Sequence, residues 1–113
     1  MIASVAGWAR RLVRRVTSRL RRPYVAQRVE ELPGILTGRV VYIVGEGGHD
    51  WSAAMLCPCG CGAALEMNLV PPSRPLWRAT VHEDGSASLH PSVWRKIGCR
   101  SHFVLSRGRV QWC

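Results

Sequence analysis

Five side chains with the chemistry of metal ligands fall in two short segments of the sequence, CPCGCG (57–62) and GCRSHF (98–103). They are Cys57, Cys59, Cys61, Cys99 and His102. Zinc takes thiolate and imidazole ligands at about 2.0 to 2.3 Å and usually binds four of them. A fully extended chain would hold Cys57 and Cys61 about 13 Å apart, too far for one ion, so the first segment must turn. The residues that favour such a turn are Pro58, Gly60 and Gly62. The pattern therefore predicts one Zn2+ held by four of the five side chains.

A disulfide framework is the alternative use of these cysteines. The chain has five cysteines, which is an odd number, and the arginines near its start interrupt any apolar run typical of an export signal. Without export the compartment is reducing, and clustered cysteines there are more often metal ligands than cross-links. We therefore expect a cytoplasmic, metal-binding protein, in which the last residue, Cys113, is a spare thiol.

Two catalytic schemes are open for these residues. A catalytic zinc would leave one position for water and need a carboxylate base, for which Glu46 is preferred over Glu66. Alternatively, the four cysteines close the metal site, and His102 acts as the base for a serine nucleophile, Ser92. Ser101 is a poorer partner because neighbouring residues of a strand point to opposite faces.

Each of these catalytic residues also has a non-catalytic interpretation. Glu46 can be a solvated acid in the Gly-rich segment GEGG (45–48), and Ser92 can cap a short helix. A thiolate-rich ligand set also damps the Lewis acidity of zinc, which favours a structural metal.

The positive charge is concentrated at the start of the chain. The formal net charge is +9, and residues 1–28 hold eight of the 16 basic residues and none of the seven acidic ones. The remainder, residues 29–113, carries a net charge of only +1. We therefore divide the chain into an arginine-rich extension (1–28) and a small zinc-binding β domain (29–113). A nucleic-acid-binding zinc module is not favoured, because the metal-bearing part is nearly neutral.

The extension has the pattern of an amphipathic helix that ends before Pro23. Its apolar residues recur at three- and four-residue steps: Ile2, Val5, Trp8, Leu12, Val16 and Leu20. Three uses are open for such a helix. It can lie on an anionic membrane surface, bind nucleic acid or an acidic protein, or pack on its own domain with the arginines in water.

From residue 39 onward the pattern becomes strand-like. Expected strands, several of them joined as hairpins, cover 39–44, 51–56, 64–70, 77–82, 102–105 and 109–112. The cysteine run lies at the tip of the hairpin between the second and third of these. The segment SLHPSVWRK (88–96) is expected to begin extended and to become a short helix after Pro91. The predicted fold class is mainly β: a small, zinc-stapled antiparallel sheet of five or six strands with an N-terminal amphipathic helix.

The tryptophans are expected to fill the thin core of such a domain. Those in the β domain are Trp51, Trp77, Trp94 and Trp112. A surface on which they stack a ligand is the alternative.

Several segments together resemble a family of small bacterial proteins encoded beside ubiquitin-like proteins and E1-like and E2-like enzymes, in operons of antiphage defence. The segments are VYIVGEGG (41–48), CPCGCG (57–62), PSVWR (91–95), GCRSHF (98–103) and RVQW (109–112). The resemblance implies a peptidase or other auxiliary protein that trims the ubiquitin-like modifier or removes it from its targets. It does not reach the arginine-rich extension.

Two classes of function therefore remain. The first is a hydrolase that cuts a peptide or isopeptide bond of a ubiquitin-like protein, as the resemblance implies. The second is a non-catalytic zinc-stapled module that docks a modifier, an E1-like or E2-like enzyme or another acidic partner, and the residue chemistry alone favours it.

Overall fold

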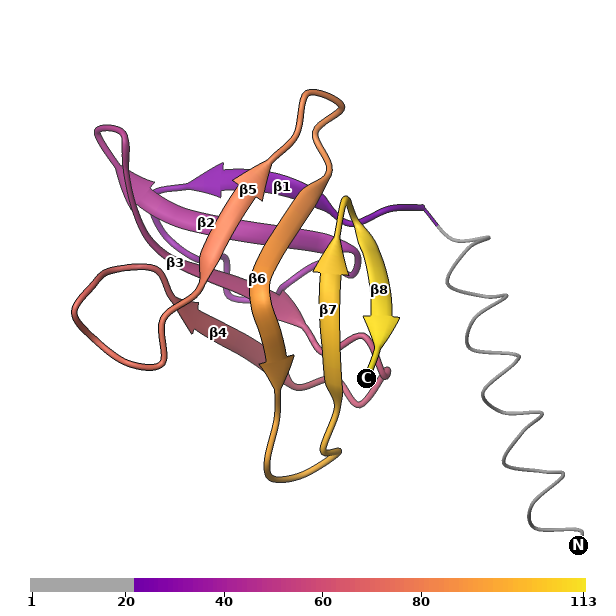
Figure 1. Ribbon diagram of the computed structural model, residues 1–113. Coiled ribbons are helices and arrows are strands. Elements are labelled where there is room, and N and C mark those ends of the chain that lie inside the picture. The colour runs from indigo at the N-terminus through magenta and orange to yellow at the C-terminus, as the bar shows by residue number, and fades with distance from the viewer. Residues whose placement is uncertain (1–21) are drawn as a thin grey trace, which may run out of the picture.

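The computed structural model describes residues 22–113, and these form eight β-strands in two four-stranded sheets (Figure 1). The first sheet has the order β1-β2-β3-β4 and the second β5-β6-β7-β8. Only β1 and β2 pair in parallel; the other neighbours are antiparallel. The strands are β1 (Val25–Val29), β2 (Val40–Glu46), β3 (His49–Leu56), β4 (Ala64–Asn68), β5 (Arg78–Val81), β6 (Ala87–Trp94), β7 (His102–Ser106) and β8 (Arg109–Trp112).

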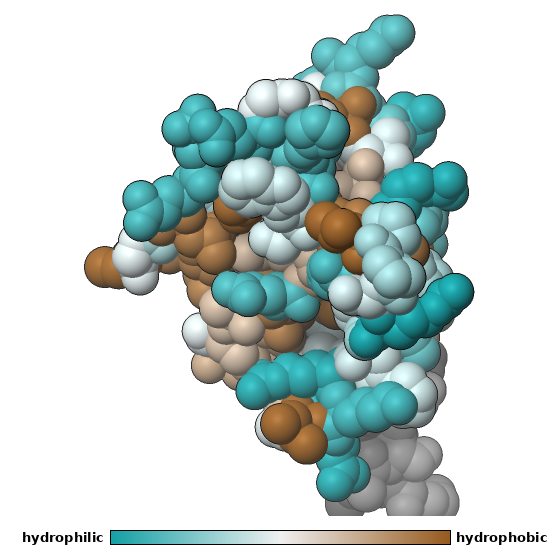
Figure 2. Space-filling view, turned by 90° about the vertical axis from the view of Figure 1, so that its left-hand side faces the viewer, coloured by the Kyte–Doolittle hydropathy of each residue, from teal (hydrophilic) through white to brown (hydrophobic). Residues whose placement is uncertain are grey.

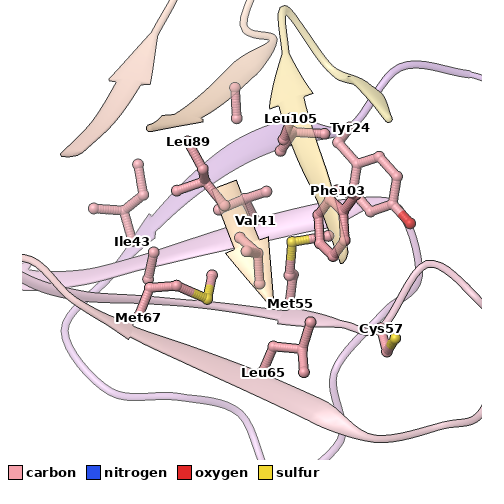
Figure 3. Packing of buried hydrophobic residues seen from close by; sticks show 13 residues of the cluster. Tyr24, Val41, Ile43, Met55, Cys57, Leu65, Met67, Leu89, Phe103 and Leu105 are labelled. Carbon is pink, nitrogen blue, oxygen red and sulfur yellow. The ribbon is translucent and has the colours of Figure 1, made fainter. Parts of the chain in front are cut away.

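The two sheets pack face to face, and their strands cross steeply (Figure 1). The largest fully buried side chains come from both sheets, with Ile43 and Met55 from the first and Leu89 and Phe103 from the second. Figure 3 shows these side chains meeting between the sheets. Burying this apolar surface from water is the main stabilising contribution to such a fold.

A short segment before and within β1 joins the two sheets through backbone hydrogen bonds. The N–H of Tyr24 donates to the carbonyl of Gly108 (2.9 Å), and the N–H of Ala87 donates to the carbonyl of Tyr24 (3.1 Å). The N–H of Ala26 donates to the carbonyl of Gly85 (2.9 Å), and the Tyr24 ring is buried in the core. The expected boundary at residue 28 therefore lies inside a strand of the sheet.

The expected hairpins are confirmed where the signals are local. β3 and β4 pair as the hairpin that carries the cysteine run, and β7 and β8 close the chain as a second hairpin. The expectation of a single sheet of five or six strands is wrong, because the described residues form eight strands in two sheets. The prediction missed β1, which is half exposed and carries no clear alternation.

The expected helix after Pro91 is also wrong, because β6 runs as a strand through Trp94. Val93 and Trp94 pair with β7, and this pairing buries Val93 in the core. The expected packing role holds for Trp77 and Trp112, which lie against the core. It does not hold for Trp51 and Trp94, which are exposed.

The amphipathic helix predicted before Pro23 lies outside the described residues. The membrane-surface and acidic-partner roles expected of it therefore stay predictions. Between residues 22 and 113, no helix has the length and apolar character that crossing a membrane requires.

We predict that Gly108→Ala destabilises the domain at the junction of the sheets. Gly108 has a φ of 79°, and an added Cβ would lie 2.6 Å from the Cβ of Pro23 and 2.8 Å from the carbonyl oxygen of Tyr24. Strain and overlap together should lower the free energy of unfolding by about 2 kcal/mol or more, measured by denaturant titration.

Gly85→Ala is the matched control, because Gly85 also has a positive φ but no atom within 4 Å of the added Cβ. It should cost about 1 kcal/mol, the strain alone. Equal losses from the two substitutions would contradict the assigned role of Gly108.

Candidate catalytic pair and metal centre

Four cysteines from two connections meet at one end of the domain. Three lie in the β3–β4 connection (57–63) and the fourth, Cys99, lies in the β6–β7 connection (95–101). The Sγ atoms of Cys57, Cys59, Cys61 and Cys99 all lie within 4.8 Å of one another. This sulfur group therefore ties a connection of the first sheet to a connection of the second.

The β3–β4 connection is folded back on itself as its sequence requires. The N–H of Cys57 donates to the carbonyl of Ala63 (2.8 Å), and the N–H of Gly60 donates to the carbonyl of Cys57 (3.2 Å). Gly60 has a φ of 90°, a value open to glycine and strained for other residues. The turn brings three alternate side chains to one point.

Ser101 and Arg95 hold the other connection against the sulfurs. The Sγ of Cys57 donates to the Ser101 Oγ (3.4 Å), which also lies 3.2 Å from the Cys99 Sγ. The Arg95 guanidinium donates to the sulfurs of Cys61 (3.5 Å) and Cys99 (3.6 Å). The loop is closed at its base by the Arg95 N–H, which donates to the Ser101 carbonyl (2.8 Å).

The thiols of this group differ in their proton affinity. Hydrogen bonds from the Ser101 hydroxyl and N–H lower the pKa of Cys99 to about 5, whereas burial raises the pKa of Cys57 to about 12. The Cys99 sulfur in turn raises the pKa of Arg95. Cys99 therefore favours the thiolate form beside a guanidinium, whereas Cys57 would have to lose a proton in order to bind a metal.

The spacing of the sulfurs fits one tetrahedral metal ion. Metal–sulfur bonds of about 2.3 Å in a tetrahedron separate neighbouring sulfurs by about 3.8 Å. The Cys57 sulfur lies 3.4 Å from that of Cys59 and 3.6 Å from that of Cys99. Four close cysteines can thus hold a metal ion with little movement.

His102, the fifth candidate ligand, is not part of this sulfur group. Its Nε2 lies 2.9 Å from the Oγ of Ser92, within hydrogen-bonding distance. Its ring stacks on Trp94, with the centroids 5.0 Å apart and the planes 18° from parallel. The structure therefore brings Ser92 and His102 of the Ser–His scheme together, and His102 is not part of the sulfur group.

Strand geometry explains this meeting. Trp94 and His102 are partners in the pairing of β6 and β7, so their side chains share one face of the sheet. Ser92 lies two residues before Trp94, in the irregular part of β6, and its Oγ lies within hydrogen-bonding distance of the imidazole on this face. A serine at this position reaches the imidazole diagonally across the pair of strands.

A bulge in β6 and a tryptophan hydrogen bond position Ser92. Leu89 pairs with Leu105 and Val93 with Phe103, so β6 advances four residues where β7 advances two. The bulged residues include Pro91, which has no N–H to donate to a partner strand. The Trp77 indole N–H donates to the carbonyl of Ser92 (3.1 Å). Sequence reasoning missed this role of Trp77, because nothing local links residues 77 and 92.

A second Ser–His contact joins a buried serine of β6 to the half-buried His82. The Ser88 Oγ lies 2.6 Å from the Nε2 of His82 and accepts a hydrogen bond from the N–H of Arg107 (2.8 Å). Ser88 is only 2% exposed, whereas Ser92 is half-buried. Of these two serines, only Ser92 is partly exposed.

Glu46, the expected base of a metal-bound water, lies at the other end of the first sheet. It ends β2 at the hairpin turn, and the eight residues of β3 separate this turn from the cysteine run by about 25 Å. Glu46 lines a cavity of about 230 Å³ together with Arg28 and Asp50. The structure thus does not bring Glu46 close to the sulfur group. Glu66, the other carboxylate considered, lies on the exposed side of β4.

This geometry is that of a small β protein with an open Ser–His pair beside a cysteine cluster suited to a metal. A family model described as bacterial ubiquitination-like system serine protease (BubE) matches residues 28–113, and the chain belongs to this family. Membership supports the association with bacterial ubiquitin-like systems that the sequence resemblance implies. No curated protein and no solved structure matches the chain at a significant level.

We predict that the purified protein contains about one metal ion per chain and that Cys99→Ser loses it, because the remaining sulfurs come from only one of the two connections. Elemental analysis measures this content. Cys113→Ser is the matched control, since Cys113 lies outside the sulfur group and should leave the metal in place. His102→Ala should also keep the metal; loss of the ion from this variant would make His102 a ligand after all.

Proposed function

We propose that this protein is a serine peptidase of a bacterial ubiquitin-like conjugation system, with Ser92 as the nucleophile and His102 as its base. The observation that carries the proposal is the 2.9 Å separation between the Ser92 Oγ and the His102 Nε2. The half-buried position of Ser92 and the family's description support it.

Such a pair performs acyl transfer in two halves. The Ser92 oxygen attacks the carbonyl carbon of the scissile bond while its proton passes to the Nε2 of His102. His102 then gives this proton to the departing amine as the carbon–nitrogen bond breaks, which leaves an acyl ester on Ser92. Water attacks the ester with His102 again as base, and the acid product leaves with Ser92 restored.

The role of His102 requires an imidazole that keeps its orientation. In the Ser–His–Asp triad of many serine proteases, the aspartate carboxylate holds the imidazole ring. Among the described residues no carboxylate hydrogen-bonds His102, and the stacked Trp94 ring is the group that fixes its plane. We therefore assign a Ser–His dyad.

The sulfur group is best suited to a structural Zn2+ held by Cys57, Cys59, Cys61 and Cys99. Soft thiolates select zinc in a reducing compartment, and four of them close the coordination shell without an open position for water. The ion would hold the β6–β7 connection, which separates the strand of Ser92 from His102. Glu46 has no part in this scheme.

The substrate that fits this proposal is a ubiquitin-like modifier, cut in its C-terminal region or released from a target. E1-like and E2-like enzymes of the same system are the expected partners, and the cytoplasm is the expected compartment because the thiols must stay reduced. The extension (1–28) remains a proposed contact for an anionic membrane or an acidic partner. A non-catalytic docking module is the alternative function, because a metal ion enclosed by four thiolates can have a purely structural role.

We predict that Ser92→Ala abolishes cleavage of a ubiquitin-like protein that carries a C-terminal extension, with metal content and the thermal melt unchanged. His102→Ala should lower kcat by at least about 100-fold, because general-base catalysis contributes about that much or more. A fluorophosphonate probe should label the wild-type protein at Ser92, located by peptide mass spectrometry, and should not label His102→Ala.

The contact between Ser88 and His82 provides the matched control. His82→Ala removes the other Ser–His contact and should leave both cleavage and labelling intact in folded protein. Glu46→Gln should be silent as well. Cleavage that survives Ser92→Ala, or that fails in Glu46→Gln, would overturn the proposal; if folded, metal-loaded wild-type protein cuts no modifier and takes no label, the docking module stands instead.

A further inference from the structure

Large apolar side chains are exposed on the β6–β7 connection (95–101), here called the β6–β7 loop, and on the residue before it. Ile97 on this loop is 76% exposed, and Trp94 at its start is 57% exposed. Single exposed apolar residues are ordinary on protein surfaces. These two are informative because of where they lie: Trp94 contacts the imidazole of His102, and the loop connects the two strands of the pair.

The loop is held in place at its base. Its first and last residues are joined by the hydrogen bond from the Arg95 N–H to the Ser101 carbonyl, and Cys99 belongs to the sulfur group. The exposed side chains are therefore presented by an anchored backbone. A partner that binds them would lose little free energy in ordering the loop.

The loop itself carries basic residues and no acidic one. After Asp84 the sequence contains no acidic residue, and Lys96 and Arg100 are both exposed on the loop. The Lys96 ammonium lies 5.0 Å from the centroid of the Trp94 ring, so the cation and the apolar surface are contiguous. Glu83 and Asp84 lie in the turn between β5 and β6, at the other end of β6 and about 25 Å away.

At the lower end of the molecule in Figure 2, at the height of the β6–β7 loop in Figure 1, apolar atoms are surrounded by hydrophilic side chains. We call the surface formed by Trp94, Lys96, Ile97 and Arg100 the loop surface.

We propose that the loop surface binds an acidic, extended segment of the ubiquitin-like substrate next to the scissile bond. This inference rests on the proposed function and adds the chemistry of the substrate. The ammonium of Lys96 and the guanidinium of Arg100 would bind carboxylates, and Trp94 and Ile97 would cover an apolar side chain of the same segment. An aliphatic side chain as exposed as Ile97 suits a polypeptide better than a phosphate backbone.

Exposed charges around a binding site act mainly on encounter and affinity rather than on the chemical step. The loop surface should therefore govern KM, and its contribution should fall as salt screens the charges. Ser92 and His102 should govern kcat, so kinetics can separate the two roles.

The test uses a ubiquitin-like protein with a C-terminal extension that has Asp and Glu beside the cleavage position. The double substitution Lys96→Glu and Arg100→Glu should raise KM about tenfold or more while kcat stays within about twofold. Ile97→Ser should raise KM as well. Arg74→Glu is the matched control, because Arg74 is also exposed but lies in the β4–β5 connection (69–77), and it should change neither constant.

A substrate with reversed charges distinguishes a loss of charge pairing from damage to the fold of the double variant. A substrate with Lys in place of its Asp and Glu should be poor for the wild type and should regain at least most of its kcat/KM with the double variant. An unchanged KM in the double variant, an equal rise in Arg74→Glu, or the absence of rescue would overturn the proposal.

Binding to the Ser92→Ala protein separates this proposal from the proposed function. Calorimetry with the acidic substrate should show affinity that the two loop substitutions remove, and this result would support the loop surface even if Ser92 proved not to be the nucleophile. Cleavage that depends on Ser92 but not on Lys96 and Arg100 would overturn the loop surface alone. The proposal would also be overturned if the loop substitutions left the affinity for the substrate unchanged but weakened binding to duplex DNA or to phosphatidylglycerol vesicles.

Discussion

The candidate site depends on the pairing of β6 with β7. A strand that slips by one residue turns all its side chains to the opposite face. The buried pairs Leu89 with Leu105 and Val93 with Phe103 prevent such a slip, because it would expose their side chains to water. With this register fixed, Trp94 and His102 share one face, and the bulge before Val93 together with the Trp77 hydrogen bond to the Ser92 carbonyl sets where the serine meets the imidazole.

The sulfur group secures the end of this pair of strands. A domain of this size buries a modest core, so a metal that joins the two sheets would add stability that packing alone supplies poorly. The four cysteines come from a connection of each sheet, and the second of these, the β6–β7 loop, lies between Trp94 and His102. A metal held by these cysteines would therefore need no open coordination position to affect the candidate site, since it would hold the loop that connects the strands of Ser92 and His102.

The sequence predicted what depends on local chemistry. The cysteine run, its hairpin and most of the strands follow from residue types and spacing that act over a few positions. The parallel β1 and the division into two sheets do not, because they rest on contacts between distant segments such as Tyr24 and Gly108. The misassigned helix after Pro91 had a specific effect: it hid the pairing of β6 with β7, so that Ser92 and His102 could be suggested as partners but their geometry could not be derived.

The two serine–histidine contacts that involve β6 show that a short distance between serine and histidine does not tell whether the serine is accessible. The contact of Ser88 with His82 is shorter, at 2.6 Å, than that of Ser92 with His102, at 2.9 Å. Yet Ser88 is buried and its oxygen accepts a backbone N–H, so its hydroxyl serves the interior of the fold. The bulge at Pro91 lies between the two serines, and only the serine beyond it is half-exposed and has a partner stacked on a surface tryptophan. Access, more than hydrogen bonding alone, therefore distinguishes the serine that can meet a substrate.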